Sequence, residues 1–133
     1  MNPLRFHPTV FCVKDAYQII FLTEKPGMGW VEIGGRKYID AQNGLMRWND
    51  EMHRVTVPRR ALDEAGAYAV CYQEMEDRKP YYPVHGDTVR RRYAFYPVRS
   101  GEDTRICYLA DTHGKTDGPM ACAKQRPFDL LIM

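Results

Sequence analysis

WVEIGGRKYI, residues 30–39, contains two short runs rich in β-branched and aromatic residues. The pair Gly34-Gly35 separates them. A two-residue glycine connection between alternating runs is a strong local signal of a β-hairpin, because the tight turn needs positive φ angles. Asn43-Gly44 repeats the signal a few residues later. We therefore predict a hairpin at each place and antiparallel β-structure around them.

Alternating apolar and polar residues continue on both sides of this stretch. They mark eight candidate strands, all rich in Val, Ile, Tyr, Phe and Thr. These are Thr9–Val13, Tyr17–Thr23, Trp30–Ile33, Arg36–Ala41, Leu45–Trp48, His53–Val57, Tyr68–Gln73 and Thr88–Tyr96. Strands at this spacing, with no long amphipathic helix between them, are typical of an antiparallel β-sandwich. We assign residues 1–100 to this all-β domain.

Residues 101–133 follow a different pattern. Arg105–Ala110 and Phe128–Met133 are near-continuous apolar runs, as in parallel strands that are covered on both faces. Between them Asp117 can cap a short helix. Strand, helix and strand in this span predict one β-α-β unit. Because the chain stops on a buried type of strand, we interpret its last residue as a truncation point.

Charge and composition argue against several classes of function. Nineteen basic and seventeen acidic side chains leave a formal net charge of +2, which does not favour nucleic acid or an anionic membrane. No apolar run has the roughly 18–20 residues that a membrane-spanning helix needs, and no signal peptide is recognisable. The four cysteines lack CxxC spacing. We expect reduced thiols and a cytoplasmic location, with a Cys12–Cys71 disulfide as the alternative.

Three consecutive arginines, Arg90 to Arg92, are the most basic stretch of the chain. Alternation along a strand places Arg91 on one face with Val89 and Tyr93, and the other two arginines on the opposite face. A nucleic-acid contact is one interpretation. The simpler one is a charged strand that discourages pairing at the edge of a sheet.

Asp111 and His113 follow the first apolar run of the second segment, with one residue between them. In an extended segment such residues point to the same side, so both side chains can face one cation. They follow the C-terminal end of a predicted parallel strand, where open α/β sheets bind their ligands. Oxygen and nitrogen donors suit zinc, manganese or iron better than calcium. The alternative is a turn capped by Asp111 beside an ordinary loop histidine.

CYLADTHG, residues 107–114, resembles the opening motif of the calcineurin-like metallophosphoesterases, in which a hydrophobic strand runs into Asp-x-His. The resemblance implies that Asp111 and His113 bind the first metal of a two-metal centre, with manganese, iron or zinc as the metal and a phosphate ester as the substrate. FDLLIM, residues 128–133, resembles the next strand of that family. The Gly-Asp and Gly-Asn-His motifs that follow in the family are missing, so the other ligands would lie beyond Met133.

The first hundred residues resemble the fibronectin-like sandwich that precedes the catalytic domain in purple acid phosphatases and their relatives. WVEIG, residues 30–34, is similar to V-x-Y-G, with Ile33 for the tyrosine. HRVTV, residues 53–57, and the stretch from Leu62 to Tyr68 are similar to a strand and its L-x-P-G-x-x-Y corner, without the usual proline. Purple acid phosphatases proper open their site with Gly-Asp instead of Asp-x-His.

Together these features predict an immunoglobulin- or fibronectin-like sandwich followed by the first β-α-β of a metallophosphoesterase domain. With two metal ligands, residues 1–133 alone are expected to be inactive and to hold little or no metal, because catalytic metals need three or more protein ligands. Residues 101–133 are expected to swap between molecules or self-associate if their apolar surface stays uncovered. A non-catalytic β-sandwich that serves as a binding or interaction module is the alternative.

Overall fold

A computed structural model gives the three-dimensional structure of the chain. It describes residues 4–47, 49–76, 84–97, 103–110, 114–115, 117–125 and 128–132. Internal contacts divide the chain into two compact units, Met1–Tyr96 and Pro97–Met133. Within the described residues, no helix combines the length and the apolar character needed to cross a membrane.

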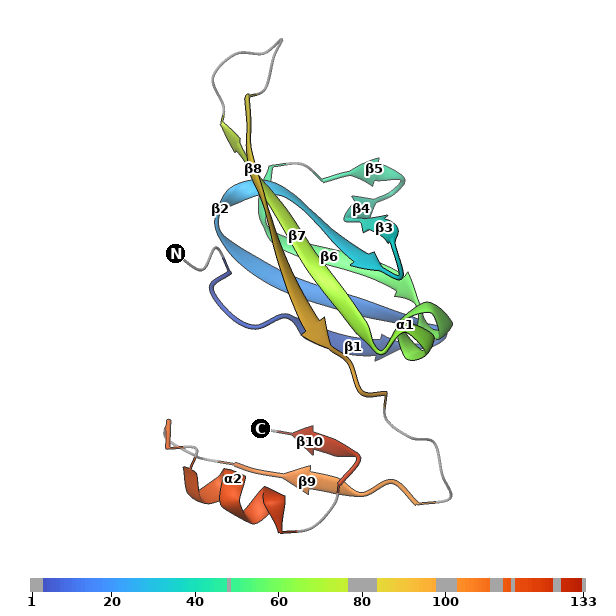
Figure 1. The fold of residues 1–133 in the computed structure, drawn as a ribbon, viewed down its shortest axis with the longest axis vertical. Coiled ribbons are helices and arrows are strands. Elements are labelled where there is room, and N and C mark those ends of the chain that lie inside the picture. The colour runs from blue at the N-terminus through green and yellow to red at the C-terminus, as the bar shows by residue number, and fades with distance from the viewer. Residues whose placement is uncertain are drawn as a thin grey trace. The chain divides into compact units, whose positions relative to one another are not determined.

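The first unit is built of antiparallel β-strands, as the sequence predicts (Figure 1). Its sheet follows the path β1-β2-β7-β8, and β3 and β6 also pair with β2. A separate small hairpin joins β4 to β5. The elements are β1 (Thr9–Val13), β2 (Ala16–Ile33), β3 (Arg36–Ile39), β4 (Ala41–Gln42), β5 (Leu45–Met46), β6 (Asp50–Pro58), α1 (Arg59–Ala65), β7 (Ala67–Glu76) and β8 (Val84–Ala94).

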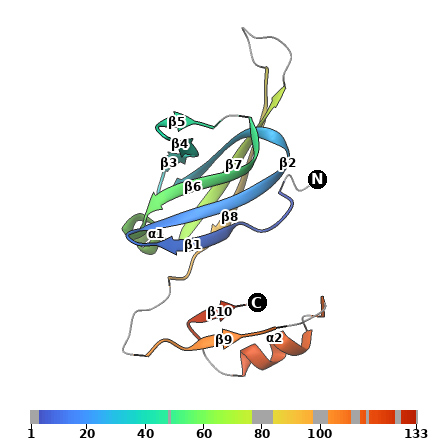
Figure 2. The same cartoon turned by 180° about the vertical axis from the view of Figure 1, so that it is seen from behind.

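Strand β2 is the longest element and bends between its two halves (Figures 1 and 2). The sequence predicts two strands here, Tyr17–Thr23 and Trp30–Ile33, but the backbone stays extended through all 18 residues. The register against β6 shifts between Leu22 and Gly27, and Pro26 is tolerated in this interrupted part of the ladder. The first half of β2 pairs with β1 and β6, and the second half pairs with β3 and β7.

The core of the first unit lies between these two halves. Inward-facing side chains alternate with outward-facing ones along each strand, as β-geometry requires. The buried cluster comprises Leu4, Tyr17, Ile19, Phe21, Val31, Ile33, Val55, Val57, Leu62, Tyr68 and Val70. Gly29 shows how closely the halves approach, because a Cβ there would lie 2.5 Å from His53 Cγ and 2.8 Å from Phe21 Cζ. Only glycine fits at this position.

Both hairpins predicted from the sequence are confirmed. Gly34 and Gly35 connect β2 to β3 with φ angles of 55° and 81°. Asn43 and Gly44 connect β4 to β5 with φ angles of 51° and 78°. Positive φ at both central residues is what a primed two-residue turn needs, which explains why glycine and asparagine occupy these places.

Helix α1 was not predicted from the sequence. It occupies the position where the resemblance implies a corner between two strands. Leu62 is its buried residue, and Gly66 closes it in the left-handed conformation with its N–H donating to Leu62 O. Arg60 and Glu64 form an ion pair of 2.6 Å one turn apart. Good helix formers followed by a glycine C-cap account for this single short helix.

The second unit contains β9 (Ile106–Tyr108), α2 (Asp117–Lys124) and β10 (Leu130–Ile132). Strand β10 pairs with β9 in parallel, which confirms the predicted orientation of the two apolar runs. The strands are shorter than those runs. Backbone hydrogen bonds of 2.9 Å from Leu109 N to Ile132 O and from Asp129 N to Arg105 O extend the pairing by one residue at each end.

Candidate functional site

The metal ligands predicted from the sequence, Asp111 and His113, lie outside the described residues. The structure describes the backbone on either side of them. Leu109 is held in the parallel ladder by its hydrogen bond to Ile132. Gly114 has a φ of 74°, a left-handed conformation that favours glycine. The Asp-Thr-His stretch therefore begins two residues after the last ladder contact and is followed by a glycine turn.

A complete metal site is not present in the described part of the chain, where no three His, Cys, Asp or Glu side chains are grouped to hold an ion. The donor chemistry of Asp111 and His113, one carboxylate and one imidazole, fits zinc, manganese or iron. Two donors supply only part of the three or more protein ligands that a catalytic metal needs.

The parallel strand pair of the second unit carries exposed apolar side chains. Ile106 is 57% exposed, Tyr108 is 69% exposed and Ile132 is 42% exposed. Parallel strands are normally covered on both faces, and such apolar surface is a usual site of further packing. Swapping or self-association through residues 101–133 stays a prediction.

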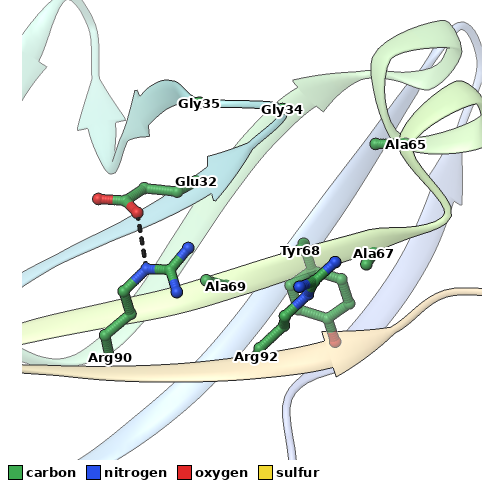
Figure 3. A pocket seen from close by; sticks show the side chains of 9 residues that line it. All are labelled: Glu32, Gly34, Gly35, Ala65, Ala67, Tyr68, Ala69, Arg90 and Arg92. Carbon is green, nitrogen blue, oxygen red and sulfur yellow. Dashed lines mark hydrogen bonds and ion pairs between the residues drawn. The ribbon is translucent and has the colours of Figure 1, made fainter.

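A cavity of about 320 Å³ lies on the outward face of the first unit, between β2, β7 and β8 (Figure 3). Ala67 and Ala69 of β7 form its floor, and their small side chains leave the space open. Arg90 and Arg92 reach over it from β8, as Figure 3 shows. The turn between β2 and β3 borders it, and a Cβ added at Gly34 would meet no atom within 4 Å.

Glu32 holds one of the two arginines in place. Arg90 Nε donates to Glu32 Oε2 at 2.9 Å, and Trp30 Nε1 donates to Glu32 Oε1 at 3.2 Å. The hydrogen bond from Arg90 is the main reason why the pKa of Glu32 lies below its usual value, and the hydrogen bond from Trp30 contributes in the same direction. Lys37 Nζ lies 4.3 Å from the centre of the Trp30 ring on the same face. Glu32 is therefore ionised, with both of its oxygens engaged.

Arg92 is different from Arg90, because its guanidinium has no hydrogen bond or ion pair with any residue that the structure describes. The alternation predicted along β8 is confirmed, since Arg90 and Arg92 share the outward face while Tyr93 packs against the core. The cavity itself was missed from the sequence. The signal that could have revealed it is the run of small residues at alternate positions of β7: Ala69 lies opposite Arg92 and Cys71 lies opposite Arg90 on the neighbouring strand.

A second cavity, of about 400 Å³, lies beside the β4–β5 hairpin. Its wall is polar and includes Gln18, Asn43 and Thr56. The arginine Arg47 on its border is neutralised by Asp50 at 2.8 Å. Asp40 and Arg54 also line it, so the described wall combines hydrogen-bonding groups with charged groups of both signs.

The thiols of the first unit carry no reactive signature. Cys71 is fully buried, and burial together with the nearby Glu32 raises its pKa to about 11. A thiol with such a pKa is a poor nucleophile at neutral pH. Cys12 is exposed and free, and Cys107 of the second unit is also free.

His53 of β6 is a buried histidine of the core. It is fully buried, and neither ring nitrogen has a hydrogen-bond partner among the described residues. Its ring packs 4.9 Å from that of Phe21. Asp40 Oδ2 lies 3.6 Å from His53 Nδ1, longer than a hydrogen bond. Burial lowers the pKa of His53, and this outweighs the opposing influence of the Asp40 and Asp50 carboxylates.

This shift makes stability depend on pH. The unfolded chain protonates His53 near its ordinary pKa of 6.5, whereas the folded chain resists protonation until lower pH. Below pH 6.5 the unfolded state therefore binds more protons than the folded state. As the pH is lowered through this range, the free energy of unfolding should fall by up to about 1.4 kcal/mol per pH unit. Urea unfolding at pH 7.5, 6.5 and 5.5 measures this slope.

The variant His53→Leu is the control for the pH measurement, because leucine fills a similar volume without a titrating group. Its slope between pH 6.5 and 5.5 should be smaller than that of the wild type by most of the histidine contribution. Equal slopes in the two proteins would show that other groups cause the acid sensitivity.

Comparison of the chain with protein-family profiles, with curated proteins and with solved structures finds no match.

Proposed function

We propose that the chain is the N-terminal part of a metal-dependent phosphoesterase, with residues 101–133 as the first β-α-β of its catalytic domain. The observation that carries the proposal is the parallel pairing of β9 with β10, with α2 between them in the chain. Asp111 and His113 follow this pairing in the sequence at the C-terminal end of β9. Ligands of open α/β sheets bind at that end of the strands.

The first unit is, in the same proposal, a fibronectin-like β-sandwich that precedes the catalytic domain. Three features support it: the antiparallel strand order, the bend in β2 and a core that both halves of β2 share. Close approach of the two halves at Gly29 supports two layers packed face to face. Helix α1 stands where the corner of the related sandwiches is expected, which is a local departure from the family pattern.

Asp111 would provide a carboxylate oxygen and His113 an imidazole nitrogen to one metal, and further ligands would come from a longer chain. Bound metals of this kind polarise the phosphoryl oxygens and supply a hydroxide near neutral pH. The turn at Gly114 directs the chain away after the second ligand. Residues 1–133 alone are proposed to be inactive, because two ligands on one loop hold a metal weakly.

Hydrolysis assays with added manganese test the proposal. The substrates are one phosphomonoester and one phosphodiester, and the proteins are residues 1–133 and the chain extended through its natural reading frame. The extended chain should hydrolyse at least one substrate in manganese and lose this activity in a chelator. Residues 1–133 should show neither activity.

Two results would contradict parts of the proposal. Metal-dependent turnover by residues 1–133 alone would show that the site is complete without further chain. An extended chain that folds but never turns over a phosphate ester would overturn the phosphoesterase assignment. It would favour the rival function, a β-sandwich binding module, to which the arginine-bordered cavity would then give a binding surface.

A further inference from the structure

We propose that the cavity between β2, β7 and β8 binds a singly charged oxyanion, the carboxylate or phosphate group of a small molecule. Its central residue is Arg92, whose guanidinium borders the cavity and has no partner within the described part of the chain. A free arginine fork presents paired N–H donors whose geometry matches two oxygens of one anion. This site lies in the first unit and does not depend on the metal ligands.

Arg92 belongs to a cavity with several lining residues and is not an isolated surface charge. Arg90 is fixed through its Nε by Glu32, and Figure 3 shows its guanidinium next to Ala69 while that of Arg92 lies over Tyr68. Ala67 and Ala69 have small side chains, so the space that both arginines line stays open to an anion. The volume of about 320 Å³ exceeds the size of one anion, which leaves room for the group that carries it.

The charge of the lining selects for one negative charge. Two guanidinium groups and one carboxylate give a net charge of +1. The C-terminal end of α1 borders the cavity at Ala65, and the carbonyls at a helix C-terminus disfavour additional negative charge. A dianion would leave one negative charge without a counterpart in the lining and costs more to desolvate, so a monoanion is expected to bind more tightly than a dianion of similar size.

Nuclear magnetic resonance titration of residues 1–133 at pH 7 tests the site. Acetate and dimethyl phosphate are the two monoanionic probes, sulfate is the dianionic one, and chloride keeps the ionic strength constant. Saturable shifts of the Gly34, Gly35 and Ala69 amides are expected with at least one monoanion, at a lower Kd than with sulfate. The monoanion with the lower Kd identifies carboxylate or phosphate as the preferred chemistry.

Variants of β8 distinguish a site from general attraction to a basic strand. Arg92→Ala should raise the Kd of the bound monoanion about tenfold, since it removes a charge-assisted hydrogen-bond pair. Arg91→Ala removes the same charge from the opposite face of the strand and should leave the Kd unchanged. Ala67→Leu keeps every charge but fills the floor of the cavity, and should abolish saturable binding.

Unperturbed amide signals away from the cavity verify that each variant is folded. Shifts that rise linearly without saturation for both monoanions would overturn the proposal. An equal loss of binding in Arg91→Ala and Arg92→Ala would also overturn it, because that result indicates nonspecific attraction to the basic strand.

Discussion

In the chain extended through its natural reading frame, Asp111→Ala and His113→Ala should each lower manganese-dependent hydrolysis of phosphate esters by at least about 100-fold. Loss of groups that merely support a ligand costs 10–100-fold in affinity or activity, so loss of a ligand is expected at or beyond the top of that range. The measurements are kcat/KM and the manganese concentration that gives half of the maximal activity. Both variants should need more manganese.

Asp103→Ala is the matched control for this prediction. Asp103 is an exposed carboxylate that precedes β9 in the same unit, and its loss should change neither kcat/KM nor the manganese requirement. Unchanged turnover in both Asp111→Ala and His113→Ala would show that the Asp-Thr-His stretch is a turn without a metal role. A similar loss in the control would point to damaged folding of the second unit.

Phe21→Ala should destabilise the first unit by about 3–5 kcal/mol, the usual cost of removing a large aromatic side chain from a core. Phe21 is 1% exposed and belongs to the first half of β2. Its ring lies against His53, and its Cζ faces the backbone of Gly29 in the second half of β2. Truncation therefore leaves a cavity between the two halves. Urea unfolding, followed by the fluorescence of the two tryptophans, measures the change.

Phe11→Ala makes the same chemical change at an exposed site. Phe11 lies in β1 and is 50% exposed, so its truncation should change stability by no more than about 0.5 kcal/mol. The two variants should shift the unfolding midpoint by very different amounts at a similar denaturant slope. Equal shifts would contradict a core located between the two halves of β2.

Local sequence patterns were sufficient for the antiparallel character of the first unit and for its two predicted hairpin turns. Alternation and the pairs Gly34-Gly35 and Asn43-Gly44 predicted antiparallel strands and two hairpins, and the structure has both. Near-continuous apolar runs predicted the parallel pairing of β9 with β10. These features could be predicted because side-chain periodicity and positive φ are properties of a few adjacent residues.

Long-range packing decided the features that the sequence patterns did not show. The interval between Thr23 and Gly27 looks like a break, yet β2 continues through it because each half finds its own pairing partners. Alternation places His53 on the same face as Val55 and Val57, but local patterns do not show that it packs against Phe21, since that contact joins two strands far apart in the chain.

The cavity on β7 and β8 has the same origin. Alternation alone places Arg90 and Arg92 on one face of their strand. Only the pairing of β8 with β7 sets these arginines across from Ala69 and its small neighbours, and only the pairing of β7 with β2 brings in Glu32. Arg90 is neutralised, whereas Arg92 has no partner among the described residues, because cross-strand register, which depends on contacts between distant segments, decides which charges meet.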